Sequence, residues 1–356
     1  MGSPPSWSSA IIISALCVFA VSNSIFPNKY TDEFGRGPVL DAAAVGYGCD
    51  KAWNCLKRSF ESVIAESPHR NVCDDNGNTC QGTVVTAIYK KQTVIIISFG
   101  GSSDIQLQTE IANLTSTVLW PYGQGQVGYY FYQAFNNIVL APGTIANAVS
   151  DATTKHPSAE ILITGHSLGG SLASLMARYL VFIGIPAERL FLVTLAEPRL
   201  GNLEFAHDFN TALKRSARVT TRFDPIPTLP FDGFAGIKYA AHGHRIYYED
   251  GTLGNNVFVD CETATCPPET ITNLTQACHH LPFHLMYFVP RIDLYGRHHC
   301  AHGTPMPILS VNCTVPLPGL GDYHPPHELP EFKDENLHAQ LHNPDTRNKK
   351  PELAHP

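Results

Sequence analysis

The chain has 356 residues, of which 44% are hydrophobic and 15% charged, so it is long and apolar enough to form a globular protein with a sizeable core. The formal net charge is −7 and no dense basic run occurs, which argues against a nucleic-acid-binding protein.

The N-terminus predicts a secreted protein. Ile11 to Val21 is an apolar segment that is too short to span a bilayer, and the small residues Ser22 and Ser24 follow it. We therefore expect residues 1–24 to be a secretory signal peptide and the mature protein to be extracellular, without a transmembrane segment. The alternative is a buried first strand, since no Lys or Arg precedes the apolar segment.

Cysteine usage agrees with export. Of ten cysteines, Cys17 lies in the predicted signal, and the other nine lie in polar or loop-like stretches that are typical of disulfides in secreted proteins. We expect Cys73 and Cys80 to pair across the polar turn between them, and the odd number leaves one thiol over. Three glycosylation sequons begin at Asn113, Asn273 and Asn312.

Along the chain, strands and helices alternate, and this predicts an α/β protein with a mostly parallel central sheet flanked by helices. Helices are predicted by apolar periodicity, and strands by β-branched or continuous apolar runs. The predicted helices cover residues 41–56, 127–140, 144–154, 168–183 and 202–213, and the predicted strands cover 83–89, 93–99, 161–164, 190–196, 217–223 and one or two within 237–249.

Proline, histidine and charged residues dominate from residue 316 onward, so we expect residues 316–356 to be a disordered tail. His324 and His327 have metal-ligand spacing, but a solvated tail accounts for them better. Residues 297–302 also contain His and Cys, but Cys300 is better explained by a disulfide. We expect no metal and no organic cofactor.

The most informative motif is Gly165-His166-Ser167-Leu168-Gly169, which has the pattern Gly-x-Ser-x-Gly. An apolar strand precedes it and an apolar-periodic helix follows, which is the setting of a nucleophile elbow. Glycines flank the serine because the turn leaves no room for side chains. Ser167 is therefore the predicted nucleophile.

A serine nucleophile needs a base, and the base needs an orienting acid. In this kind of fold the acid and then the histidine follow the serine along the chain. The best acid is Asp224, which follows a strand in a proline-stiffened loop. Asp232 and Asp250 are weaker candidates. Five histidines compete for the role of base, and spacing favours His284, at the start of a short helix, over His242, His244, His279 and His280.

The oxyanion of an acyl-transfer reaction needs hydrogen-bond donors. One is expected from the backbone N–H of Leu168, and the other from the loop that follows an earlier strand. Phe99-Gly100-Gly101-Ser102 fits that loop, and Ser102 would supply its N–H and its hydroxyl. The alternative is a simple Gly-Gly turn.

Together these segments resemble the fungal-type (class 3) lipases, and the cysteine pattern is similar to the secreted animal branch of that family. The matching segments, in chain order, are Phe99-Gly-Gly-Ser102, Thr164-Gly-His-Ser-Leu-Gly-Gly170 with Ala173-Ser-Leu175, Ala196-Glu-Pro-Arg-Leu-Gly-Asn202, Asp224-Pro-Ile-Pro227 and His284-Leu-x-Tyr-Phe288.

The resemblance implies an α/β-hydrolase domain at residues 25–315 with a Ser167–Asp224–His284 triad. It also implies hydrolysis of carboxylic esters, above all acylglycerols, with an ester or lipid substrate at a lipid–water interface as partner. Gly100 stands where the family usually has arginine, and Glu197 stands where it usually has glutamine. The expected lid, at residues 104–119, lacks the tryptophan found in fungal members of the family. A phospholipase, an esterase for non-lipid esters such as phenolic esters, and a non-catalytic secreted lipid-binding protein remain alternatives.

Overall fold

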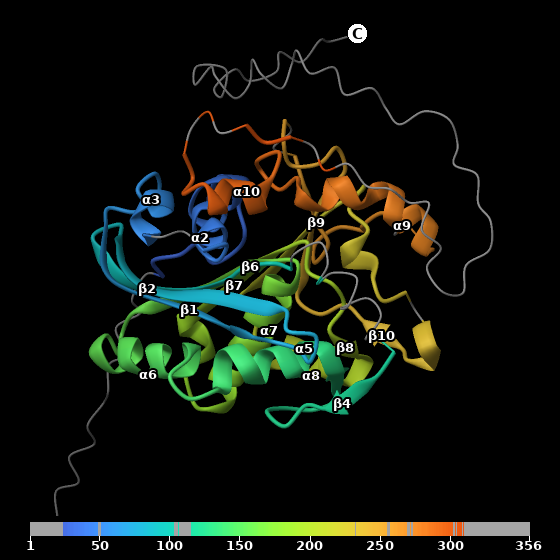
Figure 1. Ribbon diagram of the computed structural model, residues 1–356, viewed down its shortest axis with the longest axis horizontal. Coiled ribbons are helices and arrows are strands. Elements are labelled where there is room, and N and C mark those ends of the chain that lie inside the picture. Colours follow the sequence, from blue (N-terminus) through green and yellow to red (C-terminus); the bar gives the residue numbers. More distant parts are fainter. Residues whose placement is uncertain are drawn as a thin grey trace, which may run out of the picture.

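The computed structural model describes residues 24–48, 51–102, 106, 115–231, 233–254, 257–268, 271, 273–301, 303, 305–307 and 309. An eight-stranded sheet passes through the middle of the molecule, with strand order β1-β2-β3-β6-β7-β9-β11-β12 (Figure 1). Its strands are β1 (Ser62–Val72), β2 (Thr79–Tyr89), β3 (Gln92–Phe99), β6 (Glu160–His166), β7 (Leu190–Leu195), β9 (Ser216–Thr221), β11 (His244–Tyr248) and β12 (Val259–Asp260).

The central strands of this sheet are parallel, and the edges are antiparallel. β3, β6, β7, β9 and β11 run in the same direction, whereas β1, β2 and β12 pair antiparallel with their neighbours. The central strands are continuous apolar runs because both faces of the sheet are covered. The predicted α/β fold with a mostly parallel sheet is thus confirmed.

Helices cover both faces of the sheet (Figure 1). One layer contains α5 (Tyr129–Phe135), α6 (Ile145–Lys155), α7 (Leu168–Phe182) and α8 (Leu203–Ala212), and the other contains α2 (Leu40–Val45), α3 (Ala52–Leu56) and α10 (Ile292–Arg297). Each layer buries its own hydrophobic cluster against the sheet.

Shorter elements complete the described part of the chain. A second, four-stranded sheet has the order β10-β8-β5-β4. The remaining elements are β4 (Thr117–Leu119), β5 (Gln126–Gly128), β8 (Gly201–Asn202), β10 (Tyr239–Ala240), α1 (Asp32–Phe34), α9 (Leu274–His280), π-helical segments at Gly35–Val39 and Asn136–Leu140, and 3₁₀ turns at Ala187–Arg189, Ile226–Thr228, Phe234–Gly236 and Leu281–Leu285.

Two predicted helices differ from the structure. The helix expected over residues 41–56 is instead α2 and α3, because the end of α2 packs against the end of β3 so closely that a Cβ on Gly46 would overlap the Phe99 backbone. The short helix expected to have His284 in its first turn begins earlier, at Leu274, and His284 lies in the 3₁₀ turn that extends it. β1 was not predicted at all.

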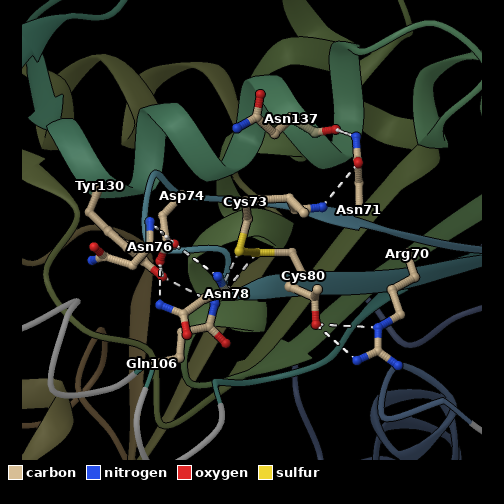
Figure 2. Close-up of a disulfide and its surroundings, with 12 residues drawn as sticks. Arg70, Asn71, Cys73, Asp74, Asn76, Asn78, Cys80, Gln106, Tyr130 and Asn137 are labelled. Atoms are coloured by element: carbon tan, nitrogen blue, oxygen red, sulfur yellow. Dashed lines mark hydrogen bonds between the residues drawn. A yellow bond between two sulfur atoms is a disulfide. The ribbon is translucent and has the colours of Figure 1, made fainter.

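The predicted disulfide between Cys73 and Cys80 is confirmed, and it closes the tip of the β1–β2 hairpin (Figure 2). Asp74 fills the turn inside it, where its carboxylate accepts hydrogen bonds from the backbone amides of Asn76 and Asn78 and from the hydroxyl of Tyr130. Two further disulfides join Cys55 to Cys300 and Cys261 to Cys266, and Cys278 is also disulfide-bonded.

Several expectations fall on residues that the structure does not describe. These are the signal peptide except for Ser24, the tail at 316–356, the sequons at Asn113 and Asn312, and most of the expected lid. Within the described residues, no helix has both the length and the apolar character needed to cross a bilayer.

Candidate active site

The central strands end at one edge of the sheet, and this edge gathers the candidate residues. Register pairs Phe99 with Gly165, His166 with Leu195, and Leu195 with Val219, so β3, β6, β7 and β9 finish close together. The carboxyl edge of parallel strands is where open α/β folds carry their ligand and catalytic sites.

Ser167 lies in a sharp turn between β6 and α7, as its motif predicts. Its φ of 58° and ψ of −127° are strained for a residue with a side chain. The neighbouring glycines permit this turn, since a Cβ on Gly165 would overlap the carbonyl of Gly169, and a Cβ on Gly169 would overlap the carbonyl of Phe99. The turn is held by a hydrogen bond from the Ser167 amide to the Leu195 carbonyl at 2.9 Å.

Asp224 and His284, 60 residues apart in sequence, lie side by side and buried. The Nδ1 atom of His284 is 3.1 Å and 3.2 Å from the two carboxylate oxygens of Asp224. A carboxylate only accepts hydrogen bonds, so Nδ1 carries the proton and Nε2 keeps a lone pair in the neutral ring. Nε2 is buried and has no hydrogen-bond partner among the described residues.

The loop around Asp224 holds its carboxylate in place. The backbone amide of Ile226 donates to Oδ1 at 2.9 Å, and the hydroxyl of Tyr287 donates to Oδ2 at 2.7 Å. Burial raises the pKa of Tyr287 well above its ordinary range, and the Asp224 carboxylate adds to this, so the phenol remains a donor. Of the other histidines considered, His242 pairs with Glu197 instead, and His280 stacks on Phe223.

The two expected oxyanion donors come from the start of α7 and from the loop that follows β3. Leu168 is the first residue of α7, where helix amides lack an acceptor within the helix. Ser102 is half-buried and follows Gly101, which packs so closely on the elbow that an added Cβ would lie 3.2 Å from the Ser167 Cβ. The loop is tied to β2 by a hydrogen bond from the Gly100 amide to the Gln81 carbonyl at 3.1 Å.

A few residues beyond this loop, the Gln106 side-chain amide is anchored at the disulfide-closed hairpin tip, 3.1 Å from both the Cys73 sulfur and the Tyr130 hydroxyl (Figure 2).

The structure also places two residues at the site that the sequence did not indicate as functional. His166 is the variable residue before the nucleophile, and its Nε2 lies 2.7 Å from the backbone carbonyl of His284. Its Nδ1 lies 2.6 Å from the hydroxyl of Tyr47, which follows α2. The histidine inside the motif was the only available signal for this pair, and nothing marked Tyr47.

The candidate metal residues do not come together in the described part of the chain. No group of three or more His, Cys, Asp or Glu side chains there has the geometry of a metal site. Cys300 is in a disulfide with Cys55, so it offers no thiolate ligand. His302, His324 and His327 lie outside the described residues.

Comparison with known proteins shows similarity to one family over part of the chain. Residues 96–234 match the family model of class 3 lipases. The chain is 30% identical to lipase ZK262.3 of Caenorhabditis elegans over 232 residues, covering 62% of each chain. It is 29% identical to a lipase of Rhizomucor miehei over 237 residues, covering 65% of this chain and 61% of the fungal one. The match thus spans less than two thirds of each relative.

Solved structures share the fold. Lipase II from Rhizopus niveus superimposes with a TM-score of 0.55 at 20% sequence identity, covering 72% of this chain and 93% of that one. A triacylglycerol lipase whose catalytic centre is described as a serine protease triad superimposes with a TM-score of 0.52 at 23% identity, covering 72% of this chain and 94% of that one. The chain is thus similar in sequence to class 3 lipases over residues 96–234, and it shares the fold of these solved lipases.

Proposed function

We propose that this protein is a secreted serine hydrolase that cleaves carboxylic esters, and that acylglycerols are its main substrates, as for a triacylglycerol lipase. The observation that carries the proposal is the buried Asp224–His284 pair, whose Nε2 atom has no hydrogen-bond partner among the described residues. The His284 ring packs on His166, the residue that directly precedes the strained Ser167 turn. The lipase names of the relatives support the substrate class.

In the proposed reaction, Nε2 of His284 takes the proton of Ser167 as the serine oxygen attacks the ester carbonyl. Asp224 orients His284 and stabilises the imidazolium that forms. The N–H of Leu168, with Ser102, stabilises the oxyanion of the tetrahedral intermediate. His284 then protonates the departing alcohol, which leaves an acyl-enzyme on Ser167. A water molecule, deprotonated by His284, releases the acid and regenerates the serine.

The burial of the site bears on how substrate enters. Ser167 and His284 are each only 3% exposed, so we propose that the protein must open locally before an ester reaches them. Lipases that open at a lipid surface gain activity once their substrate exceeds its solubility. We propose the same rise for this protein, and a smooth saturation curve across the solubility limit would argue against it.

Secretion is part of the proposal. The disulfides at Cys55–Cys300, Cys73–Cys80 and Cys261–Cys266 support an oxidising compartment. A relative whose name describes it as secreted also supports export. It is secreted mono- and diacylglycerol lipase 1 of Fusarium solani, which is 38% identical over 100 residues, covering 28% of each chain.

The test is hydrolysis of p-nitrophenyl esters from acetyl to palmitoyl by the wild type, Ser167→Ala and Ser174→Ala. Ser174 is the matched control, because it is a buried serine on α7 about two turns beyond the elbow. We expect a long-chain preference that Ser167→Ala abolishes and Ser174→Ala preserves. A preference for short chains would indicate an esterase for soluble substrates, and activity retained in Ser167→Ala would refute the proposed nucleophile.

A further inference from the structure

His166 and Tyr47 form a buried hydrogen-bonded pair directly beneath the proposed triad. His166 is fully buried and Tyr47 is 2% exposed. The two imidazole rings of His166 and His284 are 4.6 Å apart between centroids, and the Tyr287 ring lies 5.6 Å from His166. The reaction proposed above assigns no role to either member of the pair.

Protonation fixes the direction of each hydrogen bond in this pair. Burial, together with the nearby His284, lowers the pKa of His166 to about 3, so the ring is neutral at working pH. Burial likewise raises the pKa of Tyr47, which stays a phenol. The carbonyl of His284 only accepts, so His166 donates through Nε2–H. Its Nδ1 then has a lone pair, and the Tyr47 hydroxyl donates to it.

The other end of the pair reaches the oxyanion loop. The backbone amide of Gly101 hydrogen-bonds to the phenol oxygen of Tyr47. Gly101 is also packed against the elbow, since an added Cβ would lie 2.8 Å from the His166 carbonyl oxygen. A single directional chain of hydrogen bonds therefore runs from Gly101 through Tyr47 and His166 to the backbone of His284.

The charged groups around this chain leave it neutral. Asp293 and Arg291 form a mostly buried ion pair at 2.7 Å, and Asp293 interacts electrostatically with both His166 and Tyr47. Arg297 and Asp224 are the other charged neighbours. Asp224 and Asp293 each favour a protonated His166, but burial of the ring, together with the nearby His284, outweighs them and lowers its pKa.

We propose that His166 and Tyr47 are positioning residues that set the catalytic histidine and the oxyanion loop relative to each other. This inference rests on the proposed ester hydrolysis. His166 anchors the backbone of His284, and Tyr47 anchors Gly101, immediately before Ser102. A neutral His166 also leaves the neighbouring His284 free to become a cation in the transition state, whereas a protonated one would oppose it.

The test compares steady-state kinetics of Tyr47→Phe, His166→Leu and His166→Gln with those of Tyr30→Phe. Tyr30 is the matched control, because its buried hydroxyl bonds to the Tyr248 hydroxyl at 2.9 Å in a network that leads to Asp32. We expect Tyr47→Phe and His166→Leu to lower kcat about 10- to 100-fold with KM within about twofold, because misplaced groups lose transition-state contacts. His166→Gln keeps an N–H donor and should recover part of the loss.

Melting temperatures separate this role from a purely structural one. If Tyr47→Phe loses no more kcat than Tyr30→Phe at equal stability, or if His166→Gln is as inactive as His166→Leu while both are folded, the inference is wrong. A wild type without esterase activity refutes the proposed function instead. In that event, the NMR resonance of the His284 Nδ1 proton still tests whether the pair positions His284. This resonance should shift in Tyr47→Phe and stay unchanged in Tyr30→Phe.

Discussion

Two buried carboxylate–imidazole pairs lie in this molecule, Asp224 with His284 and Glu197 with His242. In each, a ring nitrogen is 3.1 Å from a carboxylate oxygen, and all four side chains are nearly inaccessible. They differ in what surrounds the histidine. His284 has its free nitrogen at the carboxyl edge of the sheet beside the elbow, whereas the ring of His242 packs against Phe209 and Phe205 of α8, at 4.4 Å and 5.6 Å between centroids.

The comparison teaches that a buried acid–histidine contact is not in itself a catalytic signature. Glu197 accepts a hydrogen bond from the Thr194 hydroxyl at 2.6 Å. It also packs against α7, since a Cβ added to Gly170 would lie 3.0 Å from the Cβ of Glu197. We infer that this second pair holds α7 and α8 to the sheet. Both ring nitrogens of His242 also lack a hydrogen-bond partner among the described residues, so a free nitrogen alone does not distinguish the pairs. What distinguishes the first pair is that the ring of His284 packs on His166, directly before the strained Ser167.

The largest effect expected is that of Asp224→Asn. The amide group would present a donor to Nδ1 and favour the wrong tautomer of His284, so kcat should fall about 10⁴-fold while the fold is kept. Ester hydrolysis and circular dichroism measure the two quantities. A rate within tenfold of the wild type would mean that Asp224 is not the orienting acid.

The elbow glycines provide the next contrast. Gly165→Ala would place its Cβ on the Gly169 carbonyl, which is backbone and has no room to move, so we expect loss of both activity and several kcal/mol of stability. Gly170→Ala meets only the side chains of Glu197 and Thr194 and should cost about 1–3 kcal/mol. Urea unfolding compares the two, and equal stabilities would contradict the close packing at Gly165.

Acid sensitivity tests the neutral state of His166. Its pKa is about 3 in the folded protein against an ordinary value of 6.5, so between these values the unfolded chain binds a proton that the native chain does not. The free energy of unfolding should therefore fall as pH drops below about 6.5, by roughly 2–3 kcal/mol at about pH 4.5 from this residue alone.

Other groups act in the same direction but are separable. Burial also lowers the pKa values of His69 and His280, so these residues act over the same pH range. The pKa values of Asp74 and Asp293 are lowered by their hydrogen bonds and, for Asp293, by Arg291. These two carboxylates therefore reduce the stability of the protein only below about pH 3.8, their ordinary pKa. His166→Gln should make the decline between about pH 6.5 and 4.5 shallower. An unchanged slope in urea titrations would show that His166 is already charged in the native protein.

The smallest effect is expected for Glu197→Gln. Glutamine keeps the length of the side chain and an acceptor for the Thr194 hydroxyl, so stability should change by about 1 kcal/mol and kcat should stay within about twofold. Thermal unfolding and ester hydrolysis check this. A large loss of kcat with stability retained would overturn the structural role assigned to the second pair.

The fold was predictable from sequence where burial repeats along the chain. β6, β7 and β9 were located within two residues at each end, because strands buried on both faces are continuous apolar runs. β1 was missed because it is an edge strand with mostly exposed or half-exposed residues and no apolar alternation. The break between α2 and α3 depends on contact with β3, which no local pattern reports.

The candidate site likewise contains residues that the sequence predicted and residues that it did not. Ser167 was predicted from a local motif, and Asp224 and His284 from their order and a family resemblance, and the structure brings these last two together. Tyr47 and His166 were not predicted as partners, because they are 119 residues apart and meet only through the tertiary fold. Polar contacts of this kind leave no periodicity in the sequence.

The central claim is that Ser167 is a nucleophile activated by His284 and Asp224. Reaction with a fluorophosphonate, followed by peptide mass mapping, tests it without knowledge of the natural substrate. We predict one label, on the peptide that contains Ser167, which disappears in Ser167→Ala and forms far more slowly in His284→Ala and Asp224→Asn. A folded wild type that takes no label, or carries it on another residue, would contradict the account.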